Sequence, residues 1–422
     1  MQATGLPLQE WLALLESYSP QEINLGLERV ELLLQRMNLS LPDRVLHVAG
    51  TNGKGSSAAM LEALLMQSGK KTGCFTSPHI LHYNERIRID GVPASDAQII
   101  AAFESIDTLR GDVPLTYFEF GTLAALAVFA EDGVEVAVLE VGLGGRLDAV
   151  NAIEPTASLI TNVSLDHCAW LGDTVNAIAG EKAGVMRTGK PAVFAAPEMP
   201  AAIVDHAAAI GANLYAAKRD YQWSGSGDTW SWVGVRHSLD NLQRPSLKGE
   251  FQIQNAAGVL TLLEVAGFDE LLTAETVDAA LSQVELAGRL QTVGDQWLLD
   301  VAHNPAAAEA LASVLAERNV SGRTIAILGM LDDKDVAGVV RPLLPYVDGW
   351  IAVTADHARA LPAAELARQV ANSTDKPCLI SESITAAIQR AEAIIGRDDV
   401  ILVTGSFYVV SGILAALGQH DG

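Results

Sequence analysis

Cysteine is scarce in this 422-residue sequence, and its distribution gives no sign of a disulfide or zinc framework. The three cysteines, Cys74, Cys168 and Cys378, are odd in number, lie far apart and form no CxxC pair. Cysteines that stabilise a small secreted domain or bind zinc usually occur in recognisable spacings. The sequence therefore predicts a reduced protein of the cytoplasm.

Long apolar runs are also missing. The longest, 122–130 and 407–417, are too short to span a bilayer as a helix. Near the N-terminus, Glu10 and Glu16 interrupt the first candidate helix, which is not typical of a signal peptide. We expect neither a membrane partner nor a signal peptide.

Basic residues are few, because 28 lysines and arginines stand against 51 aspartates and glutamates, giving a net charge of −23 at pH 7. Such a charge repels nucleic acid and anionic membranes, so neither is an expected partner. With 49% hydrophobic residues the chain is an ordinary globular protein, and its length suits two or three domains. An anionic substrate would need a locally positive site.

Strand-like and helix-like segments alternate in the first part of the chain, which is typical of βαβ units and a mostly parallel sheet. Short runs of consecutive apolar residues predict buried strands, and apolar residues at helical spacing predict the helices between them. Strands are expected at 45–49, 134–141 and 157–162, with another ending at Phe75, and helices at 55–68, 97–109 and 117–131.

The alternation starts again later in the chain, after helices expected at 252–266 and 274–284. Before them, residues 221–234 predict an antiparallel hairpin at the edge of the first sheet. Further strands are expected at 297–301, 324–328, 350–354, 377–380 and 400–404. The predicted fold class is α/β, with an N-terminal domain around a mostly parallel sheet (1–287) and a smaller, Rossmann-like α/β domain (288–422).

The strongest motif is GTNGKGS, from Gly50 to Ser56, between a predicted strand and a predicted helix. Glycines let backbone N–H groups approach phosphate oxygens, the helix N-terminus adds positive potential, and Lys54 supplies a mobile charge. The strict P-loop pattern is not met, because Val48 and Gly55 stand where it requires glycine and a hydroxyl residue. A glycine-rich turn alone can be purely structural, but the Gly-Lys pair favours phosphate binding.

Glu140 ends a hydrophobic strand and is followed by the glycine-rich segment VGLGGRLD. An acid at the C-terminal end of a parallel strand faces the ligand crevice of an open sheet. Beside a phosphate loop, Glu140 is therefore a candidate metal ligand, and Arg146 and Asp148 could reach a substrate. The alternative is a carboxylate that only caps a neighbouring helix.

The roles of two further residues, His167 and Lys182, stay open when only the local sequence is considered. His167 follows the strand predicted at 157–162 and could bind a metal, although magnesium prefers sets of oxygen ligands. Lys182 lies with Glu181 on a predicted helix, and such a pair is most often part of a solvated face.

In this order, these elements resemble the folylpolyglutamate synthase/dihydrofolate synthase family, relatives of the Mur ligases. The resemblance extends over nearly the whole chain, and the set of motifs is far more specific than any one of them. The segments INLGLERV (23–30) and LTYFEFGT (115–122) look most like the bifunctional bacterial enzymes. The other matching motifs are AGTNGKGS, TSPHI, YNERI, LEVGLGGRLDAVN, SLDH, EKAG, LAGRLQ, LDVAHNP, GMLDDKD and TGSFY.

The resemblance implies roles for residues at matching positions. ATP contacts are expected at Thr51, Asn52, Gly53, Lys54, Gly55, Ser56, Asn255, Arg289 and Asp300. Metal ligands are expected at Ser77, Glu140 and His167. Catalytic roles are expected for Lys54, for Lys182 as a carbamylated lysine, and for His303. Glutamate contacts are expected at His303 and Ser406, and pterin contacts at Leu25, Gly26, Leu27, Glu28, Thr116, Phe118, Asp148 and Ala149.

The reaction that the resemblance implies is amide formation through an acyl phosphate. ATP would phosphorylate the carboxylate of dihydropteroate or of a reduced folate, and the amine of L-glutamate would then attack. Two magnesium ions would be the cofactors, with a monovalent cation as a further candidate, and the expected state is a monomer. Both steps bring anions together, so positive charge at the site must dominate catalysis.

Other readings stay open at this point. A folylpolyglutamate synthase without the dihydropteroate activity is one, and a P-loop ATPase that couples hydrolysis to partner binding is more remote. A peptidoglycan Mur ligase would need a nucleotide-sugar-binding domain before the phosphate loop, for which Gly50 leaves too little chain. A non-catalytic folate-binding protein would not need Lys54 or Glu140.

Overall fold

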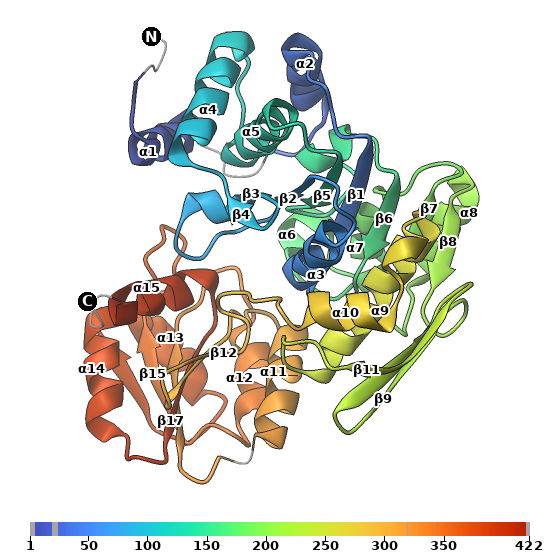
Figure 1. Ribbon diagram of the computed structural model, residues 1–422. Coiled ribbons are helices and arrows are strands. Elements are labelled where there is room, and N and C mark those ends of the chain that lie inside the picture. Colours follow the sequence, from blue (N-terminus) through green and yellow to red (C-terminus); the bar gives the residue numbers. More distant parts are fainter. Residues whose placement is uncertain (1–4, 19–23, 319, 419–422) are drawn as a thin grey trace. The chain divides into compact units, whose positions relative to one another are not determined.

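The computed structural model describes residues 5–18, 24–318 and 320–418, which form two compact units (Figure 1). Of the described residues, the first unit contains those up to Ser164, Cys168–Ser246 and Gln252–Val284. The second contains Leu165–His167, Leu247–Phe251 and the residues from Glu285 onward. A short piece of loop, 165–167, is thus separated from its chain neighbours and belongs to the second unit.

The first unit is built on an eight-stranded sheet in the order β4-β3-β2-β5-β1-β6-β7-β8. The six strands from β2 to β8 are parallel, and β3 and β4 add an antiparallel edge. The strands are β1 (Arg44–Ala49), β2 (Thr72–Phe75), β3 (Ile87–Ile89), β4 (Val92–Pro93), β5 (Val136–Glu140), β6 (Ala157–Ile160), β7 (Pro191–Phe194) and β8 (Asn213–Ala216).

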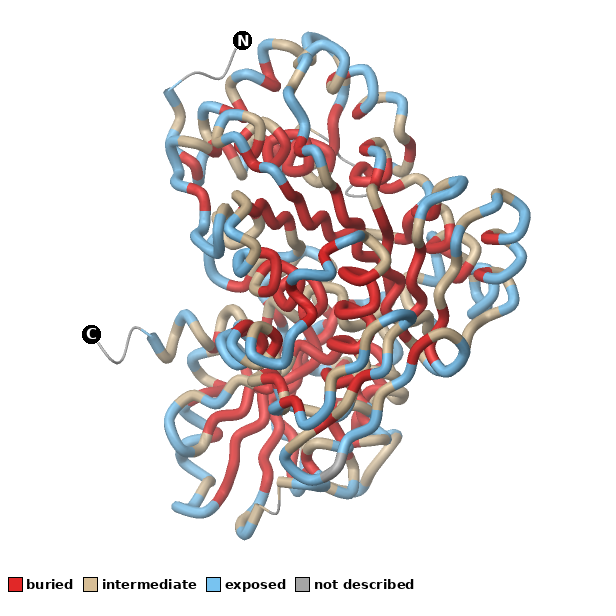
Figure 2. The backbone as a smooth tube through the Cα atoms, turned by 45° about the vertical axis from the view of Figure 1, so that its right-hand side comes forward, coloured by how far each residue is buried: buried red, intermediate tan, exposed pale blue. Residues whose placement is uncertain are grey.

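Helices cover both faces of this sheet, which explains why its central strands are buried along their whole length (Figure 2). One hydrophobic core joins the strands to α1 (Leu8–Tyr18), α2 (Glu28–Met37), α4 (Asp96–Arg110), α5 (Tyr117–Glu131), α7 (Val175–Ala183) and α8 (Ala201–Ile210). The helix α3 (Lys54–Met66) packs on β1, β2 and β5, and α10 (Ala274–Leu281) packs on α3. The remaining short helices are α6 (Cys168–Leu171), η1 (Tyr83–Arg86), η2 (Ala149–Ala152) and η3 (Asp269–Leu271).

The segment predicted as an edge hairpin forms a separate sheet, so that placement was wrong. β9 (Gln222–Ser226) and β10 (Thr229–Val233) are an antiparallel hairpin, but β11 (Ser238–Gln243) joins them in a three-stranded sheet of their own. Trp232 explains the difference, because its ring is fully buried and its Nε1 donates to Thr261 Oγ1 at 3.1 Å. The hairpin therefore packs on α9 (Glu250–Val265) and not beside a strand of the eight-stranded sheet.

The second unit contains a six-stranded sheet in the order β12-β13-β17-β14-β15-β16, parallel except for β12. Helices α11, α12 and α13 share a hydrophobic core with it, while α14 and α15 pack on each other and on β15 and β17. The strands are β12 (Gln291–Val293), β13 (Trp297–Leu299), β14 (Thr324–Leu328), β15 (Gly349–Val353), β16 (Cys378–Ser381) and β17 (Val400–Thr404). The helices are α11 (Pro305–Glu317), α12 (Val336–Leu343), α13 (Ala363–Ala371), α14 (Ile384–Ile394) and α15 (Phe407–Gly418).

The α/β class and the second, smaller α/β unit agree with the sequence-based expectation. In the parts of the chain that the structure describes, none of the helices combines the length and apolarity needed to cross a membrane.

Candidate active site

The glycine loop from Gly50 to Ser56 connects β1 to α3 at the carboxyl edge of the first sheet. Gly50 has φ +148°, and a Cβ there would stand 1.9 Å from Thr161 Oγ1. Gly53 is the N-cap of α3 with φ +83°, and its Cβ would come within 2.8 Å of Asn255 Oδ1. Both positions therefore require glycine. The N-terminus of α3 begins beside them, and a helix N-terminus stabilises a bound anion.

Hydrogen bonds hold this loop against the end of β6. The N–H of Thr51 donates to Asn162 O at 3.0 Å, and its hydroxyl accepts from Ser164 N at 3.0 Å. The N–H of Asn52 donates to Asn162 Oδ1 at 3.0 Å. Lys54 Nζ lies 3.4 Å from Thr51 O, so the ammonium group folds back over the loop. These bonds fix the backbone of the loop. The ammonium group of Lys54, the loop's own positive charge, lies over this backbone.

The helix α9 supplies two buried amides next to the loop. Gln252 Nε2 donates to Ser56 Oγ at 3.3 Å, and Asn255 Nδ2 donates to Gln252 Oε1 at 2.9 Å. Since Gly53 faces Asn255, the structure places this predicted ATP contact beside the glycine loop.

Glu140 and Ser77 lie together on the neighbouring strands of the same edge. Glu140 ends β5, pairs in register with Val48 of β1, and is only 3% exposed. Its Oε2 accepts the backbone N–H of Ser77 at 3.1 Å. A buried carboxylate beside a serine offers oxygen ligands of the kind that suit a hard divalent cation. Among the described residues no group of three His, Cys, Asp or Glu could hold a metal, so such a site would rely on other ligands as well.

Lys182 is buried, so it does not belong to a solvent-exposed helix face. It lies on α7 with 4% of its surface exposed, and its Nζ donates to Gly50 O at 2.8 Å. Its neighbour Glu181 forms a surface ion pair with Arg146 at 2.8 Å. The lysine therefore points at the glycine loop, whereas the glutamate beside it faces away.

The predicted pterin residues all lie in the first unit and share loops that contact one another. The N–H of Gly26 donates to Leu147 O at 3.2 Å, which brings the segment 25–28 to the loop before Asp148. The half-buried ring of Phe118 lies so close to Gly142 that a Cβ there would be 2.6 Å from it. Ile23, the first residue of INLGLERV, lies outside the described residues.

Two of these pterin candidates already use their polar atoms locally. Asp148 accepts from Leu143 N at 2.8 Å and from Val150 N at 3.0 Å, and it precedes the buried Ala149. Burial raises the pKa of Asp148 to about 7, and these hydrogen bonds and the charge of Lys54 oppose the rise. Thr116 caps α5 in a reciprocal capping box with Glu119. Phe118 thus offers the more accessible surface for an aromatic ligand.

In the second unit, Arg289 and Asp300 flank the antiparallel pair β12–β13. Asp300 accepts from Leu290 N at 3.0 Å and from Ala302 N at 2.9 Å. Burial raises the pKa of Asp300 above its usual range, and the charge of Arg289 opposes that rise. The Arg289 guanidinium lies 4.9 Å from the centre of the Phe407 ring.

A charged cluster forms at the carboxyl ends of the strands in the second unit. Asp166 lies 2.5 Å from Lys334 Nζ and 3.3 Å from His303 Nε2, and Asn304 Nδ2 donates to it at 3.1 Å. Burial alone would raise the pKa of Asp166, but the hydrogen bond from His303 and the charges of His303, His167 and Lys334 hold it well below its usual range. Asp166 is therefore a carboxylate held by Lys334, His303 and Asn304.

His167 and Ser406 complete the account of the predicted residues. His167 has φ +50°, and its N–H donates to Asp166 Oδ1 at 2.8 Å. It belongs to the second unit, whereas Ser77 and Glu140 meet in the first. Ser406 is buried and its Oγ accepts from Val409 N at 3.2 Å at the start of α15.

The sequence motifs SLDH and GMLDDKD gave no role to Asp166 or Lys334. Their pairing is between residues 168 positions apart, and no local pattern predicts it. The only signal was that both follow predicted strands, whose carboxyl ends share one edge of a sheet.

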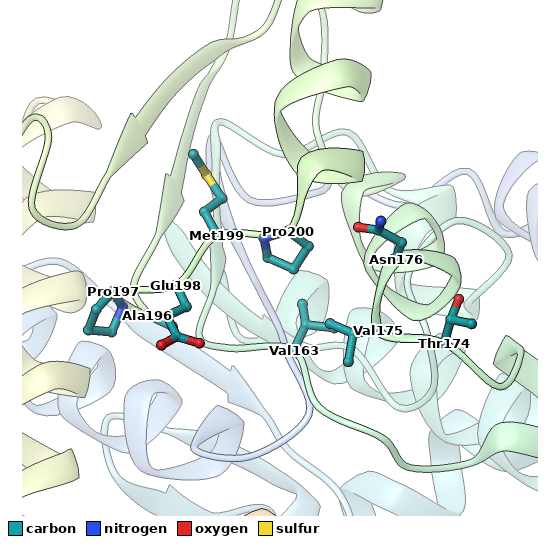
Figure 3. Close-up of a pocket in the computed structure, with 9 residues that line it drawn as sticks. All are labelled: Val163, Thr174, Val175, Asn176, Ala196, Pro197, Glu198, Met199 and Pro200. Carbon is teal, nitrogen blue, oxygen red and sulfur yellow. The ribbon is translucent and has the colours of Figure 1, made fainter.

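A cavity of about 890 Å³ opens in the first unit near the ends of β6 and β7 (Figure 3). It contains none of the predicted site residues. Its walls are mostly apolar, with one carboxylate and no cation, so it does not suit a phosphate group. The lining residues are Val163, Thr174, Val175, Asn176, Ala196, Pro197, Glu198, Met199 and Pro200.

Comparisons with known proteins agree over almost the whole chain. The family "Mur ligase middle domain" matches residues 48–263, and "Mur ligase, glutamate ligase domain" matches 288–407. The dihydrofolate synthase/folylpolyglutamate synthase of Escherichia coli is 37% identical, covering 97% of this chain and 96% of that protein. The Haemophilus influenzae protein of the same name is 35% identical, covering 97% and 98%.

Solved structures give the same answer. Escherichia coli FolC in complex with DHPP and ADP has a TM-score of 0.93 and 36% identity, covering 99% of each chain. The bifunctional folylpolyglutamate synthase/dihydrofolate synthase from Yersinia pestis, complexed with AMPPNP and Mn ion, has a TM-score of 0.90 and 40% identity, covering 98% of each. This chain therefore belongs to the Mur ligase family and, within it, to the dihydrofolate synthase/folylpolyglutamate synthases.

Proposed function

We propose that this chain is an ATP- and divalent-metal-dependent ligase that joins L-glutamate to the carboxylate of dihydropteroate and of reduced folates. The observation that carries the proposal is the arrangement of Lys54, Lys182 and Glu140 around one rigid glycine loop. These are the groups that phosphoryl transfer to a carboxylate requires. Relatives that match nearly the full length carry both activities in their names.

In the first step, the N-terminus of α3 and Lys54 hold the phosphates of ATP. The substrate carboxylate attacks the γ-phosphorus, the bond to the β-phosphate oxygen breaks, and ADP leaves, giving an acyl phosphate. Lys54 acts by stabilising the charge on the transferring group. Thr51, Asn52, Gly53, Gly55, Ser56 and Asn255, with Arg289 and Asp300 of the second unit, are the proposed ATP contacts.

In the second step, the amine of glutamate attacks the acyl carbon and inorganic phosphate leaves with the bonding electrons. His303 is a proposed contact for the incoming amine, with Ser406 nearby in the same unit. Because Asp166 accepts from His303 Nε2, it orients that imidazole. Asp166 is therefore a positioning residue.

A divalent cation, when bound, neutralises charge on the phosphates, and solved relatives contain Mn with AMPPNP. Ser77, Glu140 and His167 are the proposed ligands, and magnesium at two sites is the proposed physiological metal. The buried Glu140 beside Ser77 supports this choice, because carboxylate oxygens are ligands that a hard divalent cation prefers.

Lys182 is proposed to be carbamylated. A carbamate is an anionic oxygen ligand, whereas a buried ammonium would repel a nearby metal cation. Mass spectrometry of the native protein under carbon dioxide should show an adduct that Lys182→Ala lacks. Full activity of carbon-dioxide-depleted wild-type protein would contradict the proposal.

The deciding experiment measures ADP release with dihydropteroate or tetrahydrofolate, each with and without glutamate. The proposal expects glutamate-dependent release with both acceptors. Release that ignores glutamate would indicate an ATPase. Inertness toward dihydropteroate alone would indicate a folylpolyglutamate synthase, a name that a Mycobacterium tuberculosis structure with a TM-score of 0.86 and 31% identity carries.

The net charge of −23 argues against nucleic acid and anionic membranes as partners. We place the protein in the cytoplasm as a monomer acting on small molecules, with the pterin body near Phe118 and the segment 25–28. Size-exclusion chromatography with light scattering tests the monomer directly.

A further inference from the structure

We propose that Arg86 of the first unit binds the carboxylate that a reduced folate carries beside its reacting carboxylate, and that it is a specificity-determining residue for folate acceptors. The inference rests on the proposed function, because it concerns one of the two acceptors named there. Arg86 lies in the motif YNERI, for which the sequence predicted no role.

The backbone of Arg86 is fixed beside the segment that carries Ser77. Arg86 ends η1, and its carbonyl accepts the N–H of Thr76 at 2.9 Å. The strand β3 follows at once and pairs with β2, so that Ile87 lies opposite Phe75. Arg86 therefore lies where β2 ends, at the carboxyl edge of the eight-stranded sheet, and ligands of open α/β sheets bind at this edge.

Three neighbouring side chains orient the guanidinium of Arg86. Its Nε donates to His79 Nδ1 at 2.8 Å. Its central carbon lies 5.4 Å from the centre of the Tyr83 ring and 5.4 Å from that of the Tyr117 ring. These two rings meet edge to face, with centroids 5.9 Å apart. Contact with aromatic faces stabilises a cation without using its N–H groups, so the side chain is oriented before a ligand binds.

The outer nitrogens of the guanidinium keep their N–H groups for a ligand. Among the residues that the structure describes, none accepts a hydrogen bond from Arg86 Nη1 or Nη2, and none forms an ion pair with it. The carboxylate of the adjacent Glu85 accepts the backbone N–H groups of residues 80–82 instead, each at 2.7 Å. Arg86 is half-buried, and its planar group presents parallel donors that match a carboxylate.

The rings around Arg86 continue into the residues proposed for the pterin. Tyr117 is the first residue of α5 and lies in the chain between Thr116 and Phe118, two of the proposed pterin contacts. The Phe118 ring in turn lies 5.8 Å from the ring of Phe75, at the end of β2. Arg86 thus borders the surface on which the body of either acceptor is proposed to lie.

The two acceptors differ in the anions that they bring to this surface. Dihydropteroate has one carboxylate, and the reaction consumes it. A reduced folate ends in a glutamyl group with two carboxylates, of which one is phosphorylated and the other stays anionic throughout. An anion that leaves water needs a partner, and Arg86 supplies one at the border of the pterin site. Dihydropteroate makes no use of this partner.

A monoamide of tetrahydrofolate isolates the contact. In this acceptor the reacting carboxylate is intact and the other carboxylate is a carboxamide, which keeps the shape and removes the charge. We expect wild type to show a KM for the monoamide about tenfold or more above that for tetrahydrofolate, since a charge-assisted bond is lost.

The variant Arg86→Gln assigns that difference to one residue. It should raise the KM for tetrahydrofolate about tenfold or more and should no longer distinguish tetrahydrofolate from the monoamide, because the two changes remove the same interaction. The KM values for dihydropteroate and ATP should stay near wild type. Arg86→Lys should recover part of the loss, since it keeps the charge without the parallel donors.

Arg219→Gln is the matched control, because Arg219 is an exposed arginine of the same unit that pairs with Asp220. It should leave the KM for every acceptor unchanged. Thermal midpoints show whether each variant is folded, and Arg86→Lys takes the place of Arg86→Gln if the latter is not.

Three results would each overturn the inference. They are equal KM values of wild type for tetrahydrofolate and the monoamide, a KM for tetrahydrofolate that Arg86→Gln leaves unchanged, and an equal rise for both natural acceptors. If wild type proves inert toward dihydropteroate, the monoamide comparison still decides. Wild type that shows no glutamate-dependent ADP release with either acceptor would instead refute the proposed function itself.

Discussion

Lys54 is the first residue of α3, and its side chain supplies the positive charge of the glycine loop. Lys54→Ala should lower the rate of glutamate-dependent ADP release about a hundredfold or more, since it removes a charge that stabilises the transferring phosphoryl group. The thermal midpoint should change little, because the ammonium makes one long bond at 3.4 Å. Lys190→Ala, at an exposed position of the same unit, is the matched control. Turnover near wild type would remove Lys54 from the mechanism.

His47 is the residue from which we expect a pH-dependent loss of stability. It is fully buried in β1, and burial, with the charge of Arg187 adding, lowers its pKa from 6.5 to about 3. As the pH falls, the unfolded chain takes up a proton near pH 6.5, whereas the folded chain does so only near pH 3. Stability is therefore complete above pH 6.5 and falls by about 1.4 kcal/mol per pH unit between these values.

Urea unfolding at about pH 7.5 and pH 5.5 measures this effect. His47→Leu should reduce the difference in unfolding free energy between the two pH values by about 1.4 kcal/mol, whatever its effect at pH 7.5. His206→Gln, at a half-buried position on α8, should leave the difference unchanged. An equal difference in His47→Leu and wild type would show that His47 does not titrate as inferred.

At the scale of elements, the three-stranded sheet depends on one buried carboxylate of α9. Glu264 is 0% exposed and accepts the N–H groups of Val235, Arg236 and His237 at 2.6 to 2.8 Å. Glu264→Gln places an amide donor against these donors, so we expect a loss of about 2 kcal/mol or more in unfolding free energy. Urea denaturation measures it, with Glu275→Gln on the exposed face of α10 as control. A loss below about 0.5 kcal/mol would contradict this anchoring role.

The elements that local patterns specify were predicted well. The helix expected at 117–131 is α5 with the same bounds, and the helix expected at 97–109 is α4, which begins with a capping box of Ser95 and Gln98. Both depend on short-range chemistry that the sequence displays directly. The hairpin at 222–233 formed as expected, but its packing on α9 depends on Trp232 and Glu264, which act across long sequence separations.

The candidate site likewise contains some residues that local sequence patterns predict and others that they do not. The glycine loop and the end of β5 were predictable because each lies in a strand–loop–helix pattern. The burial of Lys182 was not, since only its contact with Gly50, 132 positions away, distinguishes it from a surface lysine. The partnership of Asp166 with Lys334 likewise arises from tertiary structure alone.

At the scale of the whole molecule, the net charge is strongly negative, whereas the residues proposed to bind phosphate are positive. The chain carries a net charge of −23, yet the cations described here gather at the carboxyl edges of the two sheets. Long-range repulsion of anionic substrates is screened over about 8 Å at physiological ionic strength, so the local cations decide binding. In the first unit, two lysines lie at the glycine loop, Lys54 over Thr51 and Lys182 against Gly50.

The last prediction follows from the number of sites. In the part of the chain that the structure describes, one glycine loop carries a lysine at a helix start, so dihydropteroate and tetrahydrofolate must be phosphorylated at the same place. The two acceptors should then compete. With both at saturating concentration, ADP release should fall between the rates seen with each alone, because each bound molecule excludes the other. The measurement is a mixed-substrate rate series at fixed ATP and glutamate, with product analysis to show that both acceptors are used. Rates that add would require two independent phosphorylation sites, and this would contradict the single loop around which Lys54, Lys182 and Glu140 converge.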